Sequence, residues 1–144
     1  MTIFQRKILG IIWLLFVCWM ISKIANKSYQ SMPNNAEITR NRQVMEDMGL
    51  SPRLIAIIMC ESGGIHFNVD GTVLRGKLDP DDTGIAQINV RYHLQKSRNL
   101  GFDIYTLEGN LGYAVYLFEH EGDRPWNSSS QCWVRSPVYI AYNR

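Results

Sequence analysis

Glu61 is the residue of this chain whose type and position best suit acid–base chemistry. It stands near the end of an apolar run over residues 51–64, in which Ser51 is a good N-cap, Pro52 suits the first helical position and a Gly-Gly pair ends the helix. The residues expected to share one helical face are Leu54, Ile57, Ile58 and Glu61. Burial on that face and the negative end of the helix dipole both raise the pKa of a carboxyl group. Such a carboxyl stays protonated near neutral pH and can donate a proton to a leaving oxygen.

A second polar segment, residues 82–89, carries one carboxylate and two amides, which are Asp82, Gln87 and Asn89. These side chains suit a segment that binds a sugar opposite Glu61. Simpler interpretations stay open for both acids. Glu61 could point into water, because ionised carboxylates are rarely buried unless they are paired. Asp82 could be a turn residue in the aspartate-rich stretch over residues 79–84.

Three segments in order carry a family resemblance: Glu61-Ser62-Gly63-Gly64, then Gly84-Ile85-Ala86-Gln87-Ile88-Asn89, then Asn110-Leu111-Gly112-Tyr113-Ala114-Val115-Tyr116-Leu117. Together they resemble the lysozyme-like superfamily, and within it the soluble lytic transglycosylase (SLT) type of peptidoglycan-cleaving domain. The resemblance covers residues 53–133. It implies that Glu61 is the catalytic acid/base and that no cofactor is needed. It also implies substrate contacts for Ser62, Gln87 and Asn89, and substrate-binding positions in the cleft, or supporting positions directly behind it, for Asn110 and Tyr116.

The resemblance leaves three functions open. With one carboxylate, Glu61 would protonate the glycosidic oxygen between MurNAc and GlcNAc and then take a proton from the muramoyl 6-hydroxyl, forming a 1,6-anhydro product. With Asp82 as a second carboxylate, as in animal-type lysozymes, the reaction would be hydrolysis. A third function is a non-catalytic module that binds the wall within a secretion, conjugation or phage apparatus. We favour the transglycosylase, acting on peptidoglycan glycan strands.

The remaining elements fit an α+β fold, mainly α, of lysozyme-like plan with a small β hairpin or sheet lobe. The sequence predicts a first helix over residues 36–48 and a helix capped by Asn89 over residues 89–99. It predicts the most apolar helix of the domain over residues 107–120. Residues 66–69 and 72–75 read as strand candidates around a turn. Residues 125–133 read as a short capping helix, with Trp126 and Trp133 packed in the core first and touching substrate second.

An unbroken apolar stretch, residues 8–21, predicts one N-terminal transmembrane helix. It spans roughly 20 Å as a helix, and extension to residue 25 brings it nearer to the ~30 Å hydrocarbon core. No good cleavage site follows, so we expect an uncleaved anchor over residues 1–25, a polar stalk over 26–35 and the domain over 36–144. We expect the domain to lie outside the cytoplasm in a bacterial or phage-infected cell envelope, anchored to the inner membrane.

Composition and residue spacing also bear on nucleic-acid binding, metal binding and disulfide formation. The net charge is +2 and no basic stripe carries interleaved aromatic residues, which excludes a nucleic-acid role. Cysteine and histidine spacings match no zinc site, so no metal is expected. In an oxidising compartment Cys60 and Cys132 would form a disulfide, whereas two buried free thiols are the alternative. His66, His93 and His120 are isolated and read as surface or ordinary polar residues.

Overall fold

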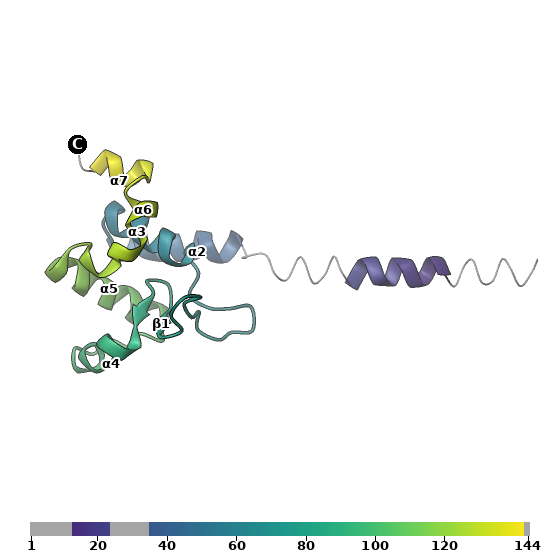
Figure 1. Ribbon diagram of the computed structural model, residues 1–144, viewed down its shortest axis with the longest axis horizontal. Coiled ribbons are helices and arrows are strands. Elements are labelled where there is room, and N and C mark those ends of the chain that lie inside the picture. Colours follow the sequence, from purple (N-terminus) through teal and green to yellow (C-terminus); the bar gives the residue numbers. More distant parts are fainter. Residues whose placement is uncertain (1–12, 24–34, 143–144) are drawn as a thin grey trace, which may run out of the picture. The chain divides into compact units, whose positions relative to one another are not determined.

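The computed structural model describes residues 13–23 and 35–142, without the side chains of residues 138, 141 and 142. The chain divides into two units, Met1–Pro33 and Asn34–Arg144, and each is described by itself. In the first unit, residues 13–23 are helical (Figure 1). Most of the apolar side chains of this helix are exposed. Within the two described ranges, no helix combines the length and hydropathy needed to cross a bilayer. The predicted anchor extends beyond these ranges, and the predicted stalk lies outside them except for Asn35.

The second unit is mainly helical, with one small antiparallel sheet (Figure 1). The class therefore agrees with the prediction of an α+β fold that is mainly α. Its helices are α2 (Asn35–Asp47), α3 (Pro52–Ser62), α4 (Val90–Asn99), α5 (Leu107–Glu121), the 3-10 helix η1 (Arg124–Ser129), α6 (Ser130–Trp133) and α7 (Pro137–Tyr142). The sequence predicts α2 to α5 to within one residue at each end. It merges η1 and α6 into one helix, and it does not predict α7.

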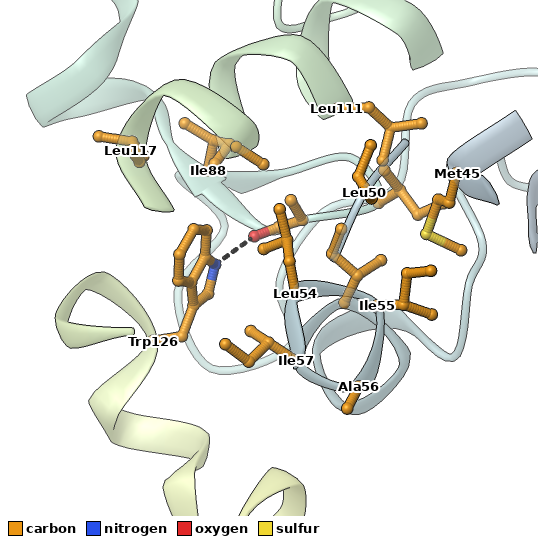
Figure 2. Packing of buried hydrophobic residues seen from close by; sticks show 14 of the residues in the cluster. Met45, Leu50, Leu54, Ile55, Ala56, Ile57, Ile88, Leu111, Leu117 and Trp126 are labelled. Atoms are coloured by element: carbon orange, nitrogen blue, oxygen red, sulfur yellow. Dashed lines mark hydrogen bonds between the residues drawn. The ribbon is translucent and has the colours of Figure 1, made fainter. Parts of the chain in front are cut away.

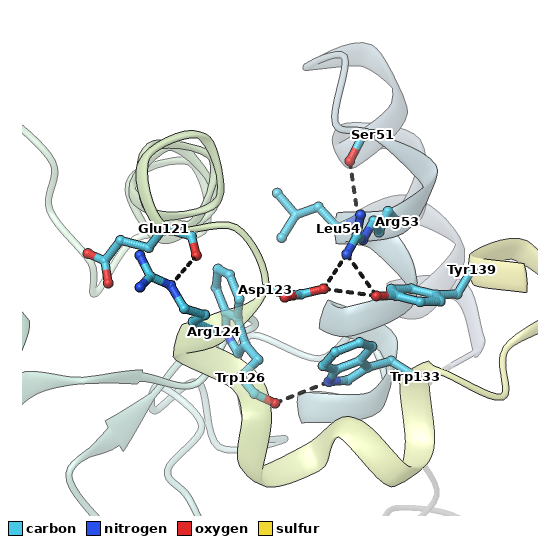
Figure 3. Close-up of polar contacts among 9 residues, drawn as sticks. All are labelled: Ser51, Arg53, Leu54, Glu121, Asp123, Arg124, Trp126, Trp133 and Tyr139. Carbon is cyan, nitrogen blue, oxygen red and sulfur yellow. Dashed lines mark hydrogen bonds and ion pairs between the residues drawn. The ribbon is translucent and has the colours of Figure 1, made fainter. Parts of the chain in front are cut away.

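Side-chain caps set the starts of three helices. The Ser51 hydroxyl accepts a hydrogen bond from the Leu54 N–H at 3.2 Å (Figure 3). Asn89 caps α4 in the same way, and Thr106 caps α5. Each cap satisfies a backbone donor that the first turn of a helix leaves without a partner. At the other end of α3, Gly63 takes the left-handed conformation, with φ of 67°.

The β lobe is smaller than predicted. Strands β1 (Asp82–Thr83) and β2 (Ile88–Asn89) pair antiparallel, with Asp82 opposite Asn89. The predicted hairpin exists, but the pairing of its two arms contains one isolated bridge, Phe67 to Val73. The second arm also pairs with the segment that begins at β1, because the Gly84 N–H donates to the Leu74 carbonyl at 2.9 Å. The hairpin therefore lies against β1, and the three segments form one small meander.

Helix α3 supplies the centre of the core. Its residues Leu54, Ile57 and Ile58 are at most 1 % exposed and belong to one cluster with buried residues of α5 and of the segment between β1 and β2. Trp126 closes this cluster from η1, and its indole N–H donates to the Ala86 carbonyl at 2.9 Å (Figure 2). Trp126 and Trp133 are each 3 % exposed, in agreement with the predicted core role of both tryptophans.

The C-terminal segment is fastened to α3 at both ends of that helix. At the start of α3, Arg53 donates to the Asp123 carboxylate and to the Tyr139 hydroxyl, and Tyr139 donates to Asp123 (Figure 3). At its end, a disulfide joins Cys60 to Cys132, with 6.0 Å between their Cα atoms. This pairing is the one that the sequence suggests for an oxidising compartment.

Candidate functional site

Glu61 lies half-buried in the last turn of α3, at the junction of two recesses. The small recess, of about 90 Å³, is also lined by Asn89, His93 and Trp126. The large recess, of about 620 Å³, is also lined by Ser62, Arg75 and Ser129. The residues that line both are Glu61, Asp82, Gln87 and Ser128. The structure thus brings the two acids and the Gln of the predicted site to one place.

The surroundings of Glu61 favour its protonated form. Burial raises the pKa of this carboxyl above its ordinary value, and the negative charge of Asp82 raises it further. A hydrogen bond from the Ser129 hydroxyl to Oε1 acts in the opposite direction, because it stabilises the ionised form. The net pKa is raised, which is the direction that a general acid requires near neutral pH.

Asp82 belongs to β1 and is held by the amide of Asn89 on the paired strand. Asn89 Nδ2 donates to Asp82 at 2.9 Å and to Asp79 at 3.0 Å, while Asn89 Oδ1 caps α4. Burial raises the pKa of Asp82, the Asn89 hydrogen bond lowers it, and the charges of Asp79 and Asp81 raise it again. The polar atoms of Asn89 are therefore already occupied within the protein, although the residue lines the small recess.

Gln87 and Ser62 differ in what they can offer to a ligand. Gln87 lines both recesses and donates through Nε2 to the Gly84 carbonyl at 2.8 Å. Among the described residues no donor contacts its Oε1, so this oxygen can accept a hydrogen bond from a substrate. Ser62 lines the large recess, but its hydroxyl accepts from the Gly64 N–H at 3.1 Å and so helps to end α3.

Asn110 lies outside both recesses and is completely buried. Its Oδ1 accepts from the Ala86 N–H at 2.9 Å, and its Nδ2 donates to the carbonyls of Thr83 and Ile104. It therefore holds the turn between β1 and β2 in place. Of the two settings that the resemblance implies, it does not line the recesses but supports the segment that carries Gln87. Gly84 makes this contact possible, because a Cβ there would lie 2.6 Å from Asn110 Nδ2.

Tyr116 also lies outside the two recesses. Its ring stacks on that of Tyr113 with 5.8 Å between centroids and lies 4.1 Å from the ring of His120. Lys96 adds a cation–π contact at 5.1 Å. The half-buried Tyr116 thus joins α4 to α5.

Several residues that line the site are missing from the sequence-based prediction, among them His93, Ser128 and Ser129. His93 lines the small recess, and its Nδ1 is 3.0 Å from the Tyr113 hydroxyl. The serines stand close before Cys132, whose partner Cys60 precedes Glu61. The pairing of the two cysteines was therefore a usable signal that this serine segment reaches the acid.

The chemistry available at the site is proton transfer. A carboxyl with a raised pKa faces a recess that also holds a second carboxylate and an amide oxygen able to bind a polar ligand. Within residues 13–23 and 35–142, no group of three or more His, Cys, Asp or Glu side chains is arranged to hold a metal ion. Comparisons of the chain with known protein families, curated proteins and solved structures give no match.

Proposed function

We propose that this chain is a peptidoglycan lytic transglycosylase that cleaves the β-1,4 bond between MurNAc and GlcNAc and forms a 1,6-anhydro-muramoyl product. The observation that carries the proposal is the setting of Glu61: a half-buried carboxyl with a raised pKa where two recesses meet. The resemblance of the Glu61, Gln87 and Asn110 segments to SLT-type domains supplies the substrate class.

In the proposed reaction Glu61 acts twice. As an acid it donates its proton to the glycosidic oxygen, so that the bond to the leaving sugar breaks while positive charge develops at the muramoyl C1. As a carboxylate it then removes the proton of the muramoyl 6-hydroxyl, whose oxygen bonds to C1. The leaving sugar has gained one proton, Glu61 is protonated again, and no water is consumed. Asp82 lines the same recesses, so its ionised form would stabilise the developing positive charge.

A lysozyme-type muramidase is the second candidate, favoured by the position of Asp82. Because Asp82 lines both recesses together with Glu61, it could act as the second carboxylate of a hydrolase. The two candidates differ in the role of water, since a hydrolase consumes one water for each bond that it cleaves and a transglycosylase consumes none.

The proposal includes a cellular location. The apolar residues 8–21 would anchor the chain in the inner membrane, with the domain outside the cytoplasm, where peptidoglycan lies. A secretion, conjugation or phage apparatus that must pass through the wall would be a suitable partner.

The test is digestion of purified peptidoglycan by the full chain, with the muropeptides identified by mass spectrometry. We expect products lighter by one water than hydrolysed muropeptides, and a loss of about 10²–10⁴-fold in rate for Glu61→Gln. Glu119→Gln on α5 is the matched control, because Glu119 is exposed and lines neither recess. Hydrolysed products lost in both Glu61→Gln and Asp82→Asn would instead establish the muramidase. A folded chain that binds but does not cleave the wall would be a binding module.

A further inference from the structure

The hydroxyl of Ser129, the last residue of η1, stands at the centre of a small hydrogen-bond network beside Glu61. It donates to Glu61 Oε1 and lies 3.0 Å from the Trp126 carbonyl, and it accepts from the Trp133 indole N–H at 3.1 Å. A serine hydroxyl has one hydrogen, so it cannot donate fully to both of its acceptors. The position of this single hydrogen therefore depends on which acceptor is satisfied by another donor.

Trp133 resolves this competition. Its single indole N–H, shared with the Ser129 hydroxyl at the same distance, also reaches the Trp126 carbonyl at 3.1 Å, so that carbonyl has a second, shared donor (Figure 3). Glu61 Oε1 has no other donor among the described residues. The Ser129 hydrogen consequently goes to Glu61. Oε2 has no donor among the described residues either, which leaves it as the oxygen that a ligand can reach.

The network is also fixed covalently. Cys132 lies one helical turn after Ser129, and its disulfide partner Cys60 directly precedes Glu61. The serine and the acid are thus carried by two backbone segments that are bonded to each other beside the contact. Such a restraint keeps the Ser129 hydroxyl within hydrogen-bond distance of Oε1 without relying on helix packing alone.

We infer that Ser129 is a positioning residue for Glu61: its hydroxyl holds Oε1, so that Oε2 is the oxygen that exchanges a proton with the substrate. The role of Oε2 rests on the proposed function, whereas the hold on Oε1 does not. A carboxyl that must act first as acid and then as base needs both forms to be accessible. Burial favours only the protonated form, and the Ser129 hydrogen bond offsets part of this effect.

Other titratable groups line the same recesses from other elements. They are Asp82 on β1, His93 on α4, and Arg75 and Lys77 in the segment before β1. From η1, the lining residues are the uncharged Pro125, Trp126, Ser128 and Ser129. A substitution of Ser129 therefore changes hydrogen bonding to Glu61 without changing any of these charges.

The experiment is a carbon-13 NMR titration of the Glu61 carboxyl in the full chain labelled at glutamate, with Glu61→Gln to assign the signal. For Ser129→Ala we expect the ratio of protonated to ionised Glu61 to rise roughly tenfold at a given pH. Ser130→Ala, the same change one residue later, lines neither recess and should leave the titration unchanged. An unchanged titration in folded Ser129→Ala would overturn the inference.

A second variant covers the case in which Ser129→Ala does not fold. Trp133→Phe removes the indole donor, so that the Trp126 carbonyl competes for the single Ser129 hydrogen. We expect a smaller change of the Glu61 titration in the same direction, and no change would count against the network. Because the titration needs no turnover, it remains informative if the chain cleaves no peptidoglycan.

In an active chain, the pH profile of kcat/KM gives the functional readout. Loss of activity at alkaline pH reports ionisation of the acid in the free enzyme. We expect this alkaline limb to move to higher pH in Ser129→Ala and to stay in place in Ser130→Ala. A uniform drop in rate with an unmoved limb would mean that Ser129 only supports the fold.

Discussion

His66 and Asn110 are two polar side chains that the fold buries completely, and both serve the turn between β1 and β2. His66 Nδ1 accepts from the Ile85 N–H at 3.1 Å, and its Nε2 lies 3.0 Å from the Tyr105 carbonyl. Because a backbone N–H can only donate, Nδ1 carries no proton and Nε2 carries one. His66 is thus held as one neutral tautomer in the interior. Of the two expectations for it, a surface residue or an ordinary polar residue, the surface position was wrong.

Replacing Asn110 tests whether its role is structural. Asn110→Leu would leave the Ala86 N–H and two carbonyls buried without a partner. We expect the free energy of unfolding to fall by about 3 kcal/mol, measured by urea denaturation at pH 7. Asn99→Ala is the control, because Asn99 is exposed, and we expect a change within about 0.5 kcal/mol. A stable Asn110→Leu variant without activity would instead assign the residue to substrate binding.

Neither burial was predictable from local sequence. His66 finds its partners at Ile85 and Tyr105, and Asn110 bonds to Thr83 and Ala86, so every one of these contacts joins distant parts of the chain. A periodic pattern reports only on apolar residues. In α5 the apolar residues Leu111, Ala114 and Leu117 are buried, but so is the polar Asn110, which such a pattern does not report.

At the scale of the elements, the longer helices α2 to α5 were predictable, whereas the strands and the short C-terminal helices were not. Ser51 and Asn89 cap the starts of α3 and α4, and Gly63 ends α3. The bounds of these helices are therefore indicated by residues close to them in the sequence. The turn signal around Asp70 and Gly71 correctly predicts a reversal. It does not indicate which strands pair with each other, however, and the regular pairing forms between β1 and β2. For the site, the positions of Glu61, Asp82 and Gln87 at one place agree with the prediction.

The disulfide between α3 and α6 should contribute strongly to stability. It joins residues 72 positions apart, and closing such a loop restricts the unfolded chain by about 4 kcal/mol in the chain-entropy model. We expect a loss of this size in the free energy of unfolding for Cys60→Ala with Cys132→Ala, measured by urea denaturation. Cys18→Ala is the control, because Cys18 is exposed and free, and it should change nothing. Equal stability of all three forms would show that packing alone holds α6 on α3.

At the scale of the whole molecule, buried titratable groups give the stability a pH dependence with opposing contributions. Burial lowers the pKa of His66 in the folded state, so the unfolded chain takes up a proton first as the pH falls. This contribution to stability is complete above the unfolded pKa of about 6.5 and is lost as the pH falls from there toward the lower folded pKa. His93 acts in the same direction. Glu61 and Asp82, whose pKa values are raised, act in the opposite direction.

The contribution of His66 can be isolated by difference. We expect the unfolding free energy of the wild type to fall below pH 6.5, with His66 contributing a slope of at most about 1.4 kcal/mol per pH unit. His66→Gln should be less stable at pH 7 and should lack this part of the slope, measured by urea denaturation between pH 7 and 5. His120→Gln is the control, because His120 is exposed. Parallel curves for wild type and His66→Gln would mean that His66 is not held neutral.

The disulfide also determines what a protease could do to this molecule. Glu61, Asp82, Gln87 and Ser129 all lie in the stretch of chain between Cys60 and Cys132, so the whole candidate site belongs to one covalent ring. One open part of that ring is the hairpin tip, where Val69 is 78 % exposed. A single backbone cut there opens the ring but leaves both fragments joined through sulfur. The nicked protein therefore remains one molecule, with its acid and its serine still on the same piece of covalent structure until a reductant separates them.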